Sequence, residues 1–174
     1  MRFLGHDENL HDAQEILYNE FMGKTLHRRE IERLVLELLK GEPTCVMATC
    51  RDDVPRASTV EFFPSGTTLY VLTEGGRKVE NVRRNPQVSV AVHAPFTGWK
   101  NVRGVQITGT AEIAERGSPV FDEGLDAYRD RRRLRQCDLP EFITIIKITP
   151  VRIEYIDTSL QRKGFKVRHT VEYE

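Results

Sequence analysis

Apolar residues early in the chain recur with the spacing of an amphipathic helix. They follow one another at intervals of one to three positions along one stripe: Ile31, Leu34, Val35, Leu38 and Leu39. This stripe predicts a helix that buries one face, and Gly41 and Pro43 end it. The preceding residues are mostly polar, with scattered apolar positions. We interpret residues 1–23 as an N-terminal helical arm and residues 24–174 as one folded domain.

From residue 44 the pattern changes to short β-branched or apolar runs that are separated by turn residues. These runs predict strands over residues 44–50, 55–63, 67–73, 87–94, 102–115, 142–149 and 151–157, and in an alternating tail from Phe165 to Tyr173. The two strands around Pro150 are expected to be separate, and helices are expected over 77–84 and 120–133. Gly104 and Gly109 predict a bulge, a bend or a close ligand approach. At least six strands with few helices between them indicate a mainly β, antiparallel barrel.

Charge and hydropathy narrow the possible partners. The chain has 174 residues, and its 26 Lys and Arg balance its 26 Asp and Glu, so it offers no global attraction for nucleic acid. Its apolar runs are far shorter than the roughly 20 residues of a membrane helix, and its first residues lack a signal-peptide core. We therefore expect a soluble cytoplasmic protein that binds neither nucleic acid nor membrane. The arginine-rich run 129–135 follows acidic residues on the same predicted helix, which favours a solvated helix over a phosphate-binding patch.

The cysteines and histidines give no sign of a disulfide or a metal site. Cys45 and Cys50 lie five positions apart in one predicted strand, so their side chains point to opposite faces. Cys137 is distant in sequence, and the histidines show no recognisable ligand spacing. We predict reduced, packed thiols and no metal.

Two short segments carry the most suggestive chemistry. Gly75 and Gly76 join a predicted strand to a predicted helix, and Arg77 and Lys78 follow directly. Glycines let successive amides converge and a helix N-terminus adds partial positive charge, so an anion is favoured there; a plain turn before a solvated helix is the alternative. Residues 55–62 place small and hydroxyl-bearing side chains in mid-strand, where a flat ligand can approach the backbone. A polar edge strand in water explains that segment equally well.

In their order and spacing, several segments together resemble the pyridoxamine 5′-phosphate oxidase-like family of flavin-binding split barrels. The likeness runs from about residue 39 to residue 157. It is carried by residues 55–60 (PRASTV), 69–73 (LYVLT), 76–78 (GRK), Asn81, 85–90 (NPQVSV) and 102–112 (VRGVQITGTAE). The set is specific, although no single segment carries the resemblance alone.

The resemblance implies a six-stranded antiparallel split β-barrel of the FMN-binding type, with a few flanking helices. It also implies a two-fold homodimer with two FMN molecules bound between the subunits. The matching cofactor-binding positions are Arg56, Ala57, Ser58 and Thr59 along the flavin ring and ribityl chain, Leu72 and Thr73 towards the phosphate, and Arg77 and Lys78 as phosphate-binding cations. The family's glutamine on a later strand falls at Gly104 here, and Gln106, two residues on, faces the same side and is taken as its substitute.

Two departures separate this chain from the oxidases that give the family its name. Glu61 stands where those oxidases usually carry a lysine, which removes one phosphate cation and places a carboxylate near the cleft. Their Trp and Arg/His substrate-binding signature has no counterpart near the C-terminus. We therefore interpret the chain as an FMN-dependent oxidoreductase other than a true pyridoxamine phosphate oxidase. Its substrate would be a small molecule, with a nicotinamide as one candidate electron donor, and we assign no catalytic side chain because hydride can reach a flavin without one.

Two other interpretations remain open. One is a non-catalytic carrier or sensor that binds flavin or haem, and the other is a barrel dimer whose cleft has lost its flavin affinity because of Glu61. Phe96 and Trp99 lie in a loop after residue 94. They form either an aromatic wall at the cofactor or the dimer seam, or part of the packed interior.

Overall fold

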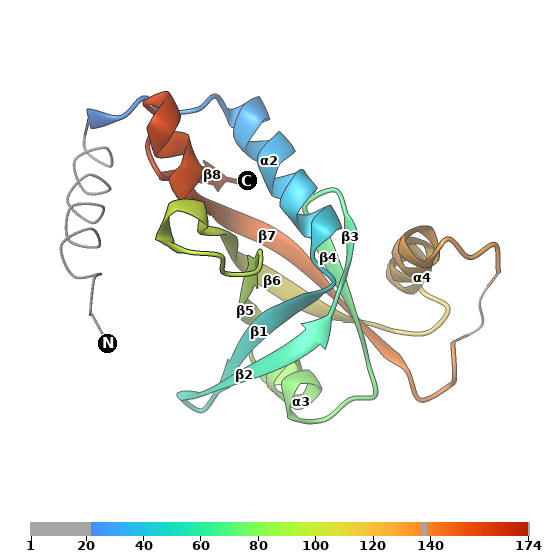
Figure 1. The fold of residues 1–174 in the computed structure, drawn as a ribbon. Coiled ribbons are helices and arrows are strands. Elements are labelled where there is room, and N and C mark those ends of the chain that lie inside the picture. Colours follow the sequence, from blue (N-terminus) through green and yellow to red (C-terminus); the bar gives the residue numbers. More distant parts are fainter. Residues whose placement is uncertain (1–21, 137–138, 174) are drawn as a thin grey trace, which may run out of the picture.

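The computed structural model describes residues 22–136 and 139–173, which fold around one curled sheet (Figure 1). The strands are β1 (Thr44–Arg51), β2 (Val54–Glu61), β3 (Phe63–Ser65), β4 (Thr68–Thr73), β5 (Gln87–His93), β6 (Arg103–Ala114), β7 (Thr144–Asp157) and β8 (Arg168–Glu172). The helices are α2 (Arg28–Gly41), α3 (Arg77–Arg84) and α4 (Pro119–Arg132), and the 3-10 turns are η1 (Trp99–Asn101) and η2 (Thr158–Lys163). The expected N-terminal arm lies almost wholly outside the described residues and stays a prediction.

The sheet has the order β2-β1-β5-β6-β7-β4-β3, and β8 pairs with the C-terminal half of β7. Every pairing is antiparallel, and the sheet curls until β2 lies beside β4 (Figure 1). The expected antiparallel split barrel with few helices is confirmed. The sheet contains eight strands where six were expected. The run expected over 55–63 divides at the fully buried Phe62 into β2 and β3, and the alternating tail adds β8.

β7 continues unbroken through Pro150, so the expected division at this residue is wrong. The register between β6 and β7 shifts between Thr108 and Gly109, and Gly109 faces Pro150. A proline cannot donate to the ladder, and a bulge is one of the few places where a strand tolerates it. A Cβ at Gly109 would lie 2.6 Å from the Thr149 carbonyl oxygen. Of the alternatives expected at Gly109, the bulge is confirmed, with Val151 of β7 as the extra residue, and the group that approaches this glycine closely is the backbone of β7.

The core lies between the inner face of the curled sheet and α2. One row across the sheet has no exposed surface at all: Met47, Val90, Ile107 and Ile153. α2 adds the buried face that its apolar stripe predicts: Ile31, Val35, Leu38 and Leu39. Each such side chain contributes about 1.5–3 kcal/mol on burial. This core fixes the relative positions of the strands that form the site.

α4 begins at Pro119, close to the predicted start, after an N-cap in which Ser118 Oγ accepts a hydrogen bond from the Phe121 N–H at 3.2 Å. Its C-terminal turn is held against the end of α2. There, Arg131 donates to the carbonyl oxygens of Leu39 at 3.2 Å and Glu42 at 2.5 Å. These bonds satisfy carbonyls at a helix end that otherwise lack intrahelical partners.

Candidate functional site

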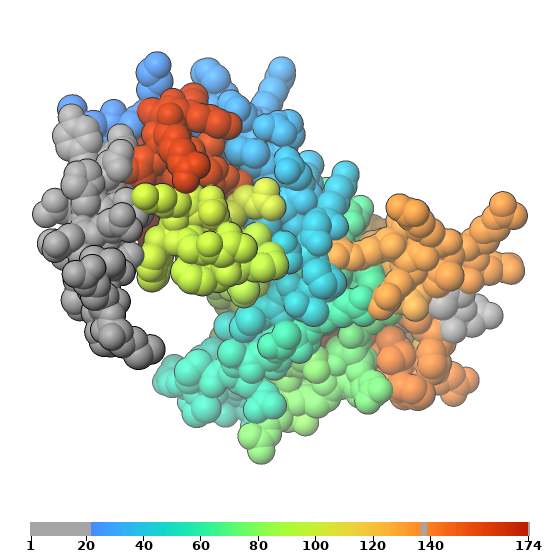
Figure 2. Space-filling view, viewed as in Figure 1, coloured from blue at the N-terminus to red at the C-terminus, as the bar shows by residue number. Residues whose placement is uncertain are grey.

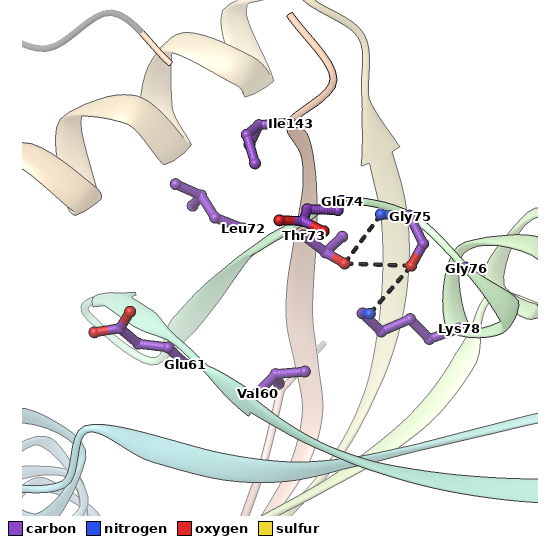
Figure 3. Close-up of a pocket in the computed structure, with 9 residues that line it drawn as sticks. All are labelled: Val60, Glu61, Leu72, Thr73, Glu74, Gly75, Gly76, Lys78 and Ile143. Atoms are coloured by element: carbon purple, nitrogen blue, oxygen red, sulfur yellow. Dashed lines mark hydrogen bonds between the residues drawn. The ribbon is translucent and has the colours of Figure 1, made fainter. Parts of the chain in front are cut away.

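A cavity of about 570 Å³ lies where the two ends of the curled sheet face each other (Figure 3). Its walls come from the end of β2, the end of β4, the turn into α3 and the segment before β7: Val60, Glu61, Leu72, Thr73, Glu74, Gly75, Gly76, Lys78 and Ile143. β2 is an edge strand, and β4 is next to the opposite edge. The cavity therefore occupies the split of the barrel.

The backbone of β2 is open on the side away from β1. Both residues of the turn 52–53 have positive φ angles, 51° and 59°, as a type I′ hairpin requires, and the residues that flank such a turn bond each other. In an antiparallel pair, every second residue of β2 then forms hydrogen bonds with β1, and the residues between them direct their backbone groups outwards. The bond from the Phe62 N–H to the Pro43 carbonyl oxygen, at 3.4 Å, fits this alternation counted from the turn. The backbone groups of Ala57 and Thr59 therefore face the free edge, where a ligand can bond to them.

The turn between β4 and α3 forms one end of the cavity. Gly75 and Gly76 have φ angles of 106° and 82°, which residues with a side chain rarely adopt. The Gly75 N–H donates to Thr73 Oγ1 at 3.2 Å, and Lys78 Nζ donates to the Gly75 carbonyl oxygen at 3.1 Å (Figure 3). A hydroxyl and an ammonium group are thus held beside a turn that exposes its backbone.

The first turn of α3 adds free amides at the same place. Val79 donates its N–H to the Gly76 carbonyl at 3.0 Å. Within the described part of the chain, the N–H groups of Arg77 and Lys78 have no hydrogen-bond acceptor, as is usual at the start of a helix. Converging amides, the helix dipole and the Lys78 ammonium make this end of the cavity attractive to an anion.

Buried contacts set the position of this anion-binding end. Asn81 Nδ2 donates to Thr49 Oγ1 of β1 at 3.0 Å, and both residues are buried. Val79 and Val82 pack into the main core on the same side of α3. Since α3 cannot shift without breaking these contacts, its N-terminus is held at a fixed place beside the cavity.

The opposite end of the cavity carries a carboxylate. Figure 3 places Glu61 across the cavity from the glycine turn, with the apolar side chains of Val60, Leu72 and Ile143 between them. Both carboxylate oxygens of Glu61 accept hydrogen bonds from Arg132 Nη2 of α4, at 2.6 and 2.8 Å. The cavity thus has an anion-binding end with Lys78 and Glu74, an apolar middle, and a far end with Glu61.

A polar cluster holds α4, and with it Arg132, against the sheet. Tyr70 Oη and Lys147 Nζ each donate to Glu123 Oε2 at 2.7 Å. The hydrogen bond from Lys147 keeps the pKa of Glu123 below its usual value, and burial raises the pKa of Tyr70. This cluster joins α4 to β4 and β7.

The family model for pyridoxamine 5′-phosphate oxidase matches residues 31–157. The matched region contains β1 to β7 and every residue that lines the cavity. The chain belongs to the pyridoxamine 5′-phosphate oxidase family.

Solved structures of other proteins share the fold. A Listeria innocua protein assigned to the same family is 26% identical, with a TM-score of 0.57 over 70% of this chain and 94% of that chain. A FAD-binding protein from Mesorhizobium loti (21% identity, TM-score 0.57, 75% and 94% coverage) and a haem storage protein from Vibrio cholerae (18%, 0.56, 69% and 89%) show the fold alone. An uncharacterized protein from Rhizobium meliloti is 35% identical over 63 residues, which span 36% of this chain and 41% of that relative.

The anion-binding end fits the terminal phosphate of a flavin, the cofactor that the family resemblance implies. Backbone amides, a threonine hydroxyl and an ammonium are the donors that phosphate groups commonly accept from. A Cβ added at Gly75 or Gly76 would meet no atom within 4 Å, so the space in front of the turn is open to a ligand. The residues of this family member therefore suit a phosphate at the turn.

Some of the predicted cofactor-binding positions lie at the cavity, and the four on β2 are divided between the two faces of that strand. Leu72, Thr73 and Lys78 line the cavity. Arg56 and Ser58 lie on the same face of β2 as Val60, which also lines it. Arg77 is exposed and is not among the lining residues.

The remaining predicted positions lie on the outer face of the sheet. Thr59 pairs with Val46, Val46 with Ala91, and Ala91 with Gln106, so one row of side chains crosses four strands. Ala57 lies on the same face of β2, and Thr59, Ala57 and Gln106 are all exposed. These three residues are not among those that line the cavity, and their role stays a prediction.

Sequence reasoning missed two contributors, Ile143 and Arg132. Ile143 comes from the segment before β7, and Arg132 from the last turn of α4. Both reach the site through contacts between distant parts of the chain, for which neither has a local sequence signal. In the arginine-rich run, the contacts of Arg131 and Arg132 described above are with groups of the protein itself.

Other expectations can be compared with the structure directly. Phe96 and Trp99 form an edge-to-face pair with ring centroids 5.5 Å apart, and they are 65% and 63% exposed, so the packed-interior alternative is wrong for the single chain. Cys45 and Cys50 lie on opposite faces of β1, as predicted, and both are free thiols. Within residues 22–136 and 139–173, no group of three or more His, Cys, Asp or Glu is placed to hold a metal, and no helix there has the length and apolar character to span a membrane.

Proposed function

We propose that this chain is a flavoprotein that binds FMN, with the terminal phosphate at the Gly75–Gly76 turn. The observation that carries the proposal is the glycine turn with its free amides and Lys78. This turn forms one end of a cavity that adjoins the unpaired edge of β2. A flavin ring has carbonyl and N–H groups along one edge, which match the backbone groups of Ala57 and Thr59. Phosphate and ring would then bind to two elements that the core holds in fixed positions.

We also propose that the functional unit is a homodimer. The predicted cofactor positions lie on both faces of β2, and one flavin in one cavity faces the inner side. A second copy of the chain supplies an outer face for the remaining positions. Val46, in the middle of the outer row, is 37% exposed in the single chain, and Figure 2 shows the loop that carries Phe96 and Trp99 (yellow-green) across a hollow from the β1–β2 hairpin (teal).

When bound, FMN supplies the electron or hydride transfer. The residues of this chain bind and orient it: the glycine turn and Lys78 hold the phosphate, the edge of β2 bonds the ring, and Leu72 and Ile143 form an apolar wall that excludes water. We propose an oxidoreductase that acts on a small molecule, and we assign no side chain to proton transfer. Anaerobic addition of NADPH to the FMN complex separates an enzyme, whose yellow colour fades, from a carrier, whose colour persists.

Haem is the alternative cofactor, since a haem storage protein shares the fold. Haem iron in proteins is commonly held by His, Cys, Met or Tyr. The residues that line the cavity include none of these. The cavity therefore supports flavin better than haem.

A titration of FMN into the purified protein, followed by the loss of flavin fluorescence, tests the proposal with two neighbouring variants. Lys78→Ala removes a charge-assisted contact, worth about 1.5–3 kcal/mol, and is expected to weaken binding roughly tenfold or more. Arg77→Ala removes the same charge from a residue that does not line the cavity, and less than about a threefold loss is expected. Circular dichroism confirms that both variants fold. If the wild-type protein binds no FMN at concentrations up to about 1 mM, the proposal is refuted. If the two variants lose FMN affinity equally, the assigned phosphate site is refuted.

A further inference from the structure

The two ends of the cavity differ in the hydrogen-bonding groups that they offer. Lys78 and Glu74 line the end at the glycine turn, and Glu61 lines the far end. Among the described residues that line the cavity, Lys78 is the one cation, and its Nζ lies against the Gly75 carbonyl oxygen at 3.1 Å. The far end therefore presents a carboxylate, a group that accepts hydrogen bonds and repels anions.

Arg132 holds this carboxylate from outside the cavity. Its Nη2 contacts both oxygens of Glu61, at 2.6 and 2.8 Å, and Arg132 itself is not among the lining residues. The guanidinium carbon lies 6.0 Å from the ring centroids of both Phe63 and Tyr128, which limits its movement. Each carboxylate oxygen has more than one acceptor site, so Glu61 can bind a ligand while it stays paired with Arg132.

The pairing has a consequence for the kind of ligand that fits. A guanidinium beside two aromatic rings is a receptor for an anion, but here an internal carboxylate already occupies it. A phosphate or carboxylate group on a ligand would have to displace Glu61 and would be repelled by it. A ligand with an N–H or O–H group finds an oriented acceptor instead.

We propose that Glu61 determines specificity at the far end, and that the substrate bound beside the flavin presents a hydroxyl, an amide N–H or a cationic amine there, with no phosphate or carboxylate. Arg132 is the positioning residue that orients Glu61. The proposal rests on the flavin binding proposed above and deepens it by naming a substrate class. It excludes a substrate that places a phosphate or a carboxylate at this end of the cavity.

Isothermal titration calorimetry with phenyl phosphate, an anionic probe that carries no amine, tests this assignment in FMN-saturated protein. Glu61→Lys replaces repulsion by attraction across a few ångströms, and the probe is expected to bind at least about tenfold more tightly than to wild type. Glu61→Gln keeps the shape of the side chain and removes its negative charge, so an intermediate gain is expected. Wild-type binding as tight as that of either variant overturns the proposal, and so does a failure of every variant to bind the probe.

Glu74→Lys is the matched control, because it makes the same change of charge at the opposite end of the same cavity. Its expected gain is less than about threefold, and a gain equal to that of Glu61→Lys overturns the proposal by showing a general charge effect. FMN titration of each variant is a separate measurement. If the wild type takes up no FMN, the proposed function fails, and the comparison of wild type with Glu61→Gln in flavin-free protein still decides the role of Glu61.

Discussion

Gly109 provides a direct test of how closely β6 and β7 approach each other. An alanine there would place its Cβ 2.6 Å from the Thr149 carbonyl oxygen and 3.2 Å from Cγ2 of Ile148. Real Cβ contacts essentially never fall below 3.0 Å, so the two strands would have to separate by several tenths of an ångström. Overpacking of this kind costs about 1–3 kcal/mol, and alanine returns about 0.4–1 kcal/mol by restricting the unfolded chain. Gly109→Ala should therefore lower the free energy of unfolding by about 1–2 kcal/mol.

Urea unfolding followed by circular dichroism measures this loss. Gly104→Ala in the same strand is the control, because its Cβ would lie 3.2 Å from the nearest atom, the Val92 carbonyl oxygen. Its free energy of unfolding should stay within about 0.5 kcal/mol of wild type. If Gly109→Ala is as stable as wild type at an unchanged m value, or if the two variants lose equal stability, the close approach at the bulge is not what requires glycine.

The remaining predictions concern contacts around the site. Arg131→Lys should lower the free energy of unfolding by about 1–2 kcal/mol in the same urea assay, because one ammonium replaces a planar donor that bonds two carbonyl oxygens at the end of α2. Asn81→Ala leaves the buried Thr49 hydroxyl without its donor, which should cost about 1–3 kcal/mol in unfolding and weaken FMN binding through the displacement of α3. Burial raises the pKa of the Cys45 thiol from 9.0 to about 12, so at pH 8 iodoacetamide should label the half-buried Cys50 and spare Cys45, as mass spectrometry of the peptides would show. Above about pH 9 the unfolded chain loses the Cys45 proton first, so this residue should lower stability as the pH rises.

Local patterns were sufficient to predict most elements of the fold. The apolar stripe of α2, the alternation in β5 and the turn residues between the strands depend on neighbouring residues alone. The continuity of β7 through Pro150 depends on a bulge in β7 opposite Gly109 of the neighbouring strand β6, and a local rule for proline could not predict that pairing. β3 is a short strand that exists through its pairing with β4, which the sequence pattern of three residues does not reveal.

The candidate site divides in the same way. Gly75, Gly76 and Lys78 could be found because a glycine pair before a helix has a local physical meaning. The pairing of Glu61 with Arg132 joins residues that are far apart in the sequence, and neither residue type predicts its partner. The division of the cofactor positions between two faces of β2 follows from strand alternation, but only the structure shows that the cavity lies at the end of this strand, at Val60 and Glu61.

The unpaired edge of β2 bears on the tendency of the protein to aggregate before a ligand binds. Exposed strand edges invite other chains to add a strand, which is a route to aggregation. Pro55 blocks part of this edge, because its position in the ladder is one whose N–H would point outwards and proline has none. Further along, the open backbone of Ala57 and Thr59 has no such protection from the part of the chain that the structure describes. A cofactor or a second subunit that covers these groups would also protect the newly folded barrel from aggregation.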